Sequence, residues 1–258
     1  MNKRVTLKSV GALRRLRGMA ALCALLWAAA TFGVEKDVDR QKVLAYVEKL
    51  SEIKAPQQAL DYWRTLEPEL GGTDGRYEYW LGKIYQDLQQ NEAALQAFNQ
   101  SVKLDPGNRW PYVKIAEIGI QQGAYEAVES LMNKLINAYP DWSVPPLILA
   151  QSYYASGRYD DAVKAVTSSL KIELTLEGYV LLSKAALETQ DYLTVVQAGV
   201  TAQESDPQLQ KDPELSERIV QALVGMERRD KAAVYLDGQK SALSAETIRA
   251  LQEKYALK

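Results

Sequence analysis

Apolar residues recur along the chain at the spacing of amphipathic helices, and this pattern itself repeats. The clearest stretch runs from residue 143 to residue 174, where apolar and polar positions follow a helical period on both sides of Gly157. A window moved back by 34 residues, and then by 34 more, finds the same order again, and a forward step of 33 finds it once more. Self-similarity at a fixed period predicts an array of helical repeats rather than one globular core.

Four units follow from this period, and they lie at about residues 75–108, 109–142, 143–175 and 176–209. Each unit is predicted to hold two antiparallel helices joined by a tight turn, such as the one at Gly157. Prolines stand where one unit meets the next, at Pro106, Pro140 and Pro207, because proline cannot continue the helix before it. The prolines and the turns therefore keep the same phase as the apolar repeat.

The segments on either side follow the pattern more loosely. Residues 37–70 are predicted to form a degenerate N-terminal helical pair. Residues 215–258 are predicted to form another degenerate pair and a capping helix, which begins after Ser244 as its N-cap. Such departures are expected of terminal units, since each covers only one neighbour and faces water on its other side.

A small residue follows an apolar one at the same place in the first helix of every unit. These small residues are Gly82, Ala116, Ala150 and Ser183. The partner helix is expected to cross closely at this place, so that a large side chain would push the pair apart. The unit at 143–175 shows the whole order, and its defining residues are Leu149, Ala150, Tyr153, Gly157, Tyr159 and Ala162.

This order of residues at 34-residue spacing resembles the tetratricopeptide repeat, closely over residues 75–209 and loosely in the flanks. The resemblance implies an all-α fold, a right-handed α-solenoid of antiparallel helix pairs. Four positions depart from the pattern. Gly119 and Ala186 stand where a tyrosine is expected, Gly199 replaces a large residue, and Leu174 replaces the closing proline.

In that family the first helices line a concave face, which binds extended peptides or helices of partner proteins. The resemblance therefore implies a groove for an amphipathic segment, with Tyr79, Trp110 and Tyr154 as aromatic anchors. Burial against the neighbouring repeat explains Val113 and Leu147 equally well. The candidate partner-binding residues are Arg76, Tyr79, Lys83, Trp110, Val113, Glu117, Leu147, Gln151, Tyr154 and Lys184.

The first 33 residues have the composition of a bacterial export signal. Residues 1–17 are basic and contain no acid, residues 18–33 are mostly apolar, and three alanines at 28–30 offer a cleavage site. A short membrane anchor is the alternative, although an anchor needs about 20 apolar residues. Either interpretation places the body of the protein outside the cytoplasm, in the periplasm or otherwise exported, with inner-membrane anchoring if the leader is retained.

Charge separates the leader from the rest of the chain. The first 30 residues hold six basic side chains and no acidic one, which leaves 25 basic and 33 acidic side chains and a net charge of −8 in the remainder. An acidic body disfavours nucleic acid and anionic lipid as its main partner. Contact with a membrane is expected only through an uncleaved N-terminal segment.

The residue types available also exclude most common catalytic chemistry. The chain has no histidine, and its one cysteine, Cys23, lies in the leader. The body therefore has no Cys/His zinc site, no disulfide and no Ser-His or Cys-His nucleophile. Adjacent acids such as Asp160 and Asp161 are typical of a solvated helix face. We expect no catalytic residue, no metal and no cofactor.

The favoured interpretation is a non-catalytic exported adaptor or scaffold. It would bind a peptide or helical segment of an envelope protein in its groove and support assembly of a secretion, pilus, polysaccharide-export or cell-wall complex. The alternative is a structural repeat protein that forms homo-oligomers or is anchored to a membrane.

Overall fold

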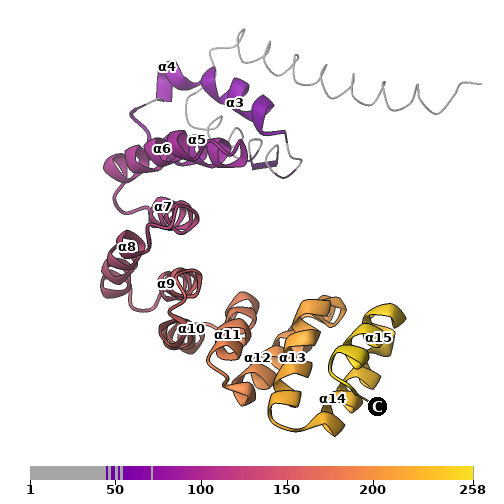
Figure 1. Ribbon diagram of the computed structural model, residues 1–258. Helices are drawn as coiled ribbons and strands as arrows, with labels where there is room; N and C mark the ends of the chain where they lie inside the picture. Colours follow the sequence, from indigo (N-terminus) through magenta and orange to yellow (C-terminus); the bar gives the residue numbers. More distant parts are fainter. Residues whose placement is uncertain (1–44, 46–47, 50–51, 53–54, 71, 258) are drawn as a thin grey trace, which may run out of the picture.

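The computed structural model describes residues 45, 48–49, 52, 55–70 and 72–257 (Figure 1). The predicted leader at 1–33 and most of the first helix of the predicted pair at 37–70 lie outside these residues. Within the described part the chain forms α-helices, two short 3-10 helices and no strand. No described helix has the length and apolar character that crossing a membrane requires.

The helices follow one another in antiparallel pairs with short joins. Their bounds are α3 Pro56–Arg64, α4 Glu67–Leu70, α5 Gly75–Asp87, α6 Asn91–Leu104, α7 Trp110–Gln121, α8 Tyr125–Ala138, α9 Val144–Ala155, α10 Tyr159–Ile172, α11 Leu176–Glu188, α12 Tyr192–Ser205, η1 Pro207–Lys211, α13 Pro213–Gly225, α14 Arg229–Gly238, η2 Gln239–Ser241 and α15 Ala245–Lys254.

The pairs stack along an arc. In Figure 1, α7, α9, α11 and α13 lie on the inner side of the curve, and α8, α10, α12 and α14 lie outside it. From α5 to α14 each helix packs on the next along the chain, and α7 also contacts α9, α9 contacts α11 and α11 contacts α13. The fold is thus an all-α solenoid, as the repeat pattern predicts, and its inner wall is a continuous row of first helices.

The tight turns within the five pairs from α5 to α14 share one backbone conformation, in which a residue with positive φ ends the first helix. Gly123 and Gly157 have positive φ angles of 73° and 76°, and Gln89, Gln190 and Glu227 take the equivalent left-handed conformation at the other three turns. At each turn the next N–H donates to a carbonyl five residues earlier, with N···O distances of 2.8 or 2.9 Å. This is the Schellman arrangement, which ends a helix and reverses the chain.

Within a pair the two helices approach most closely at the small position. A Cβ built on Gly82 would lie 2.5 Å from Cε1 of Phe98 on α6. Ala116, Ala150 and Ser183 are fully buried at the equivalent places. The close crossing that the sequence predicts is therefore present, and it explains why these positions exclude large side chains.

Buried serines tie the two ends of a unit together. Ser101 on α6 donates a 2.6 Å hydrogen bond to the carbonyl of Gly75, the first residue of α5. Ser169 on α10 donates a 2.8 Å hydrogen bond to the carbonyl of Ser143, just before α9. Each bond links the second helix of the unit to the start of the first helix.

Two glycines that depart from the family pattern are compensated by their neighbours. A Cβ on Gly119 would lie 2.8 Å from Cγ2 of Val128, and a Cβ on Gly199 would lie 2.8 Å from Cγ1 of Ile219. An aliphatic side chain from a neighbouring helix thus occupies the space that a large residue fills elsewhere. Leu174, in place of the closing proline, is exposed to solvent.

The described ends of the array are closed by different contacts. At the N-terminal end, the buried ring of Trp63 on α3 stacks on Tyr77 with ring centres 5.0 Å apart, and its Nε1 donates to the Tyr77 carbonyl. At the other end, α15 buries Ile248 and Leu251. Lys254, in the last turn of α15, pairs with Glu217 on α13 at 2.5 Å. Each terminal helix thus covers apolar surface that the stack would otherwise expose.

Candidate partner-binding surface

The candidate residues on α5 form a partly exposed patch of aromatic and basic side chains. Tyr79 is half-buried, with its ring centre 5.8 Å from that of Trp80 and 5.9 Å from that of Phe98. The Lys83 ammonium lies 4.2 Å from the centre of the Trp80 ring. Arg76 is exposed and forms a 3.1 Å ion pair with Asp74, the N-cap of the helix. Packing therefore holds the aromatic part of the patch in place.

Burial changes the proton affinity of two of these groups. It lowers the pKa of Lys83 below its usual 10.5, and the charge of Lys114 on α7 lowers this pKa further, against the attraction of Glu48 and Asp87. Burial likewise raises the pKa of Tyr79 above 10, and Glu117 and Glu48 add to this effect. The effect of Lys114 on Lys83 indicates that α5 and α7 present positive charge to the same region.

Polar contacts continue along the inner helices. Glu117 forms a 2.7 Å ion pair with Lys114 one turn earlier on α7. Nε2 of Gln151 on α9 donates a 2.6 Å hydrogen bond to Glu177 on α11, which bridges two neighbouring inner helices. Tyr154 packs edge-on against Tyr159 with ring centres 5.4 Å apart. Lys184 is half-buried on α11.

Two of the candidate residues lie inside the stack. Val113 is 2% exposed and Leu147 is 7% exposed, and both belong to the apolar cluster that joins α7, α8, α9 and α10. The inner helices contact one another directly, so an apolar side chain at this place is covered by the neighbouring repeat. These two residues are core residues in this structure, and they offer almost no surface to a partner.

Trp110 stands apart from the other candidates. It is the first residue of α7 and is 51% exposed. Its ring packs edge-on against Trp142, which precedes α9, with ring centres 5.8 Å apart. Trp142 also meets the ring of Tyr139, and the guanidinium of Arg109 lies over both rings. Sequence reasoning missed Arg109, Tyr139 and Trp142, although two tryptophans about one period apart beside repeat joins were a usable signal.

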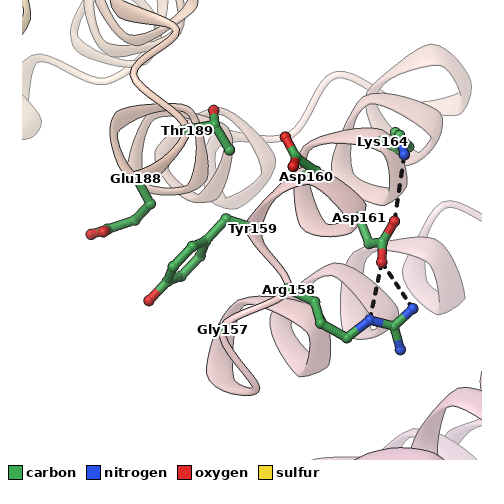
Figure 2. Close-up of a pocket in the computed structure, with 8 residues that line it drawn as sticks. All are labelled: Gly157, Arg158, Tyr159, Asp160, Asp161, Lys164, Glu188 and Thr189. Atoms are coloured by element: carbon green, nitrogen blue, oxygen red, sulfur yellow. Dashed lines mark hydrogen bonds and ion pairs between the residues drawn. The ribbon is translucent and has the colours of Figure 1, made fainter.

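A shallow depression of about 470 Å³ lies where the turn after α9 meets the end of α11. Its lining residues are Gly157, Arg158, Tyr159, Asp160, Asp161, Lys164, Glu188 and Thr189. Figure 2 shows the carboxylates of Asp160 and Asp161 pointing away from each other.

Three of the charged side chains in this depression, Arg158, Asp161 and Lys164, already form ion pairs. Arg158 pairs with Asp161 at 2.8 Å and with Glu129 at 2.7 Å, and the bond from Arg158 lowers the pKa of Asp161 below 3.8. Because Asp161 is ion-paired and the carboxylate of Asp160 points away from it, the two acids do not form a convergent pair of carboxylates. No cluster of metal-ligating side chains occurs in the described residues.

Comparison with known proteins agrees with this architecture. Residues 76–108, which span α5 and α6, match the family model of the tetratricopeptide repeat. The helix pair α5–α6 therefore matches the tetratricopeptide repeat, and the described chain has the fold of proteins built from this repeat. It is 29% identical over 102 residues to the protein STIP1 homolog of Dictyostelium discoideum, a match that covers 40% of this chain. The chain spans only 17% of the length of that relative.

Solved structures show the same tetratricopeptide-repeat fold at low identity. Pseudomonas aeruginosa pilF superposes with a TM-score of 0.66 at 14% identity, covering 83% of this chain and 97% of pilF. Yeast Tom70 superposes with a TM-score of 0.58 at 15% identity, covering 77% of this chain and 43% of Tom70. These likenesses establish the fold, and repeats of this kind mediate protein–protein interaction.

Proposed function

We propose that this tetratricopeptide-repeat protein is a non-catalytic adaptor that holds a segment of another protein along the inner wall formed by α5, α7, α9, α11 and α13. The observation that carries the proposal is the direct contact between successive inner helices, from α7 to α13. This contact produces one continuous surface from α7 to α13, which carries half-buried Gln151 and Tyr154, and α5 adds half-buried Tyr79 and Lys83 at its N-terminal end.

The chemistry of this wall suits binding rather than turnover. Two of its acids are engaged locally, since Glu117 pairs with Lys114 and Glu177 accepts a hydrogen bond from Gln151. Rigid aromatic rings between such polar groups give contact area at low entropic cost, and they leave edges for hydrogen bonds. An amphipathic helix or an extended segment would place apolar side chains on Tyr79 and Tyr154 and polar ones on Lys83 and Lys184.

We also propose that the body is exported and serves an envelope assembly. The support is the basic and apolar leader at residues 1–33, followed by an acidic body without cysteine. Expression of the full chain in a bacterium with two membranes, followed by osmotic release and N-terminal sequencing, tests this part. A new N-terminus close to residues 28–34 in the released fraction is expected, and a full-length cytoplasmic protein would contradict export.

Site-specific photo-cross-linking in the native organism tests the groove. A benzophenone amino acid at Lys184 or at Gln151 should yield one discrete adduct with a second protein, and the adduct should be lost when Tyr154→Ala is added. The control position is Lys171, which is exposed on the outer helix α10. An adduct at Lys171 of equal strength would refute the groove, and an adduct of twice the chain mass would favour self-association.

A further inference from the structure

Four residues at two neighbouring repeat joins form an exposed platform of rings around one cation. Arg109 ends the join before α7 and Trp110 begins α7, and Tyr139 and Trp142 come from the join before α9. The Trp142 ring is nearly perpendicular to both others, at 85° to Trp110 and 89° to Tyr139. We call these four residues the Arg109 platform.

The protein core holds this platform in a fixed geometry. Tyr139 and Trp142 are half-buried against the largest apolar cluster. The backbone N–H of Trp142 donates a hydrogen bond to the backbone carbonyl of Tyr139 at 3.1 Å. The N–H of Trp110 donates to Oδ1 of Asn108 at 3.2 Å, which fixes the start of α7. Only Trp110 exposes a large fraction of an aromatic ring, so an incoming group meets a preorganised surface.

The cation position between the rings is already filled by the protein itself. The guanidinium carbon of Arg109 lies 4.7 Å from the centre of the Trp142 ring and 5.1 Å from that of Tyr139. A guanidinium stacked on rings keeps its N–H donors at its planar edge, where they match a carboxylate. Within the described residues Arg109 has no ion pair with an acid, although the chain has a net negative charge.

We propose that the Arg109 platform binds an extended segment of a partner protein that carries a proline or another apolar residue two or three positions from an aspartate or glutamate. The apolar residue covers the exposed face of Trp110, and the carboxylate accepts hydrogen bonds from Arg109. An extended chain advances about 3.3 Å per residue. Side chains at that spacing reach both groups, because the Trp110 ring and the guanidinium both lie against Trp142.

Charge complementarity favours a protein segment over the two other occupants of such a surface. A cationic side chain would compete with Arg109 for the same ring faces. An anionic bilayer would approach Asp105 and Asp141, which are exposed on the same two joins. A single carboxylate that bonds Arg109 directly avoids both conflicts. The platform includes none of Tyr79, Lys83, Gln151 and Tyr154, so its test can fail while the proposed groove stands.

Three matched probes test the proposal by fluorescence anisotropy. They are end-capped, fluorescein-labelled proline-rich peptides of about twelve residues that carry a single glutamate, glutamine or lysine two positions from a proline, so they share an extended conformation and differ in one charge. The full chain should bind the glutamate peptide about tenfold more tightly than the glutamine peptide, and the lysine peptide most weakly. A glutamate peptide that shows no binding up to millimolar concentration would overturn the proposal.

Variants locate the binding on the platform. Trp110→Ala should weaken binding of the glutamate peptide about tenfold, and Arg109→Gln should remove the preference for glutamate over glutamine. Leu193→Ala, which trims another exposed apolar side chain on α12, should change nothing. Tyr154→Ala should also leave peptide binding intact, which separates this site from the groove. Unchanged binding in Trp110→Ala and Arg109→Gln, or Trp110-dependent binding to phosphatidylcholine vesicles without peptide binding, would refute the proposal.

Discussion

Gly82 lies directly against the ring of Phe98, and a methyl group built on Gly82 would come within 2.5 Å of Cε1 of that ring. Real Cβ atoms do not approach a neighbour so closely, so the first repeat requires glycine where the second and third repeats have alanine. The volume of the facing side chain sets this choice. Phe98 is fully buried and cannot move away without opening a cavity.

Gly82→Ala should therefore destabilise the protein, although alanine is the better helix former. We expect a loss of about 1–3 kcal/mol in the free energy of unfolding, the usual cost of overpacking a core. Urea denaturation followed by circular dichroism measures it. Gly107→Ala is the control, because the nearest atom to its Cβ would be Oδ1 of Asp105 at 3.5 Å, an ordinary contact. Equal stability of Gly82→Ala and wild type would show that Phe98 can move aside.

The left-handed turns predict opposite effects for two substitutions at equivalent places. Gln190 has a φ angle of 58°, which costs a side-chain-bearing residue about 1 kcal/mol. Gln190→Gly should raise the midpoint of thermal unfolding because it relieves this strain. The gain is smaller than the strain alone would give, because glycine has a larger conformational entropy in the unfolded chain. Gly157→Ala should lower the midpoint, because alanine is strained at the positive φ angle of this residue. No atom lies within 4 Å of the added Cβ, so a steric clash does not contribute. Shifts of the same sign in both variants would contradict this account.

A buried polar network holds the C-terminal units together. The Tyr235 hydroxyl donates to Oε1 of Gln203 at 3.0 Å, and Nε2 of Gln203 donates to Ser216 at 3.2 Å. Tyr235→Phe leaves that buried amide oxygen without its donor, so we expect a loss of about 1–3 kcal/mol. Tyr112→Phe removes an exposed, long hydrogen bond to Pro106 and should cost much less. Similar losses in the two variants would show that the network is not the cause.

Glu78 makes stability depend on pH. It is 7% exposed on α5, and Oε1 accepts a 2.7 Å hydrogen bond from the N–H of Gly72. Burial raises the pKa of Glu78 above its usual 4.5, and Glu67 adds to this, whereas the bond from Gly72 opposes it. The folded protein therefore keeps this proton to a higher pH than the unfolded chain. Its contribution to the free energy of unfolding is largest below the unfolded pKa and falls as pH rises through the folded pKa.

Glu78→Gln should remove the fall in the free energy of unfolding as pH rises. The amide oxygen of the glutamine can still accept the hydrogen bond from the N–H of Gly72. We expect the variant to gain stability relative to wild type at pH 7 and to show no relative gain below pH 4.5. Thermal unfolding across this range gives the measurement. Glu92→Gln, an exposed substitution on α6, is the control and should follow the wild-type curve. A relative gain for Glu78→Gln that grows as pH falls would reverse the assigned sign.

Much of the fold could be predicted from the sequence, because the repeat makes its features local. The small residue at Gly82 and the turn glycine at Gly157 act within one helix pair, and the proline at Pro140 acts at the join that follows a pair, so spacing along the chain suffices to place them. The left-handed turns at Gln89 and Gln190 were predicted only as turns, since glutamine carries no signal for positive φ.

The sequence by itself determined the repeat period, the helix pairs and the absence of histidine and of cysteine from the body, since these depend on residue type and spacing. The tertiary structure decided which candidate side chains are exposed and which are buried. Val113 and Leu147 are buried between repeats, because the neighbouring repeat covers them. The ring of Trp110 contacts that of Trp142 in the next join, because stacking of the repeats brings the two joins together. Such contacts depend on how one repeat is rotated on the next, and the order of residues within a repeat does not encode that rotation.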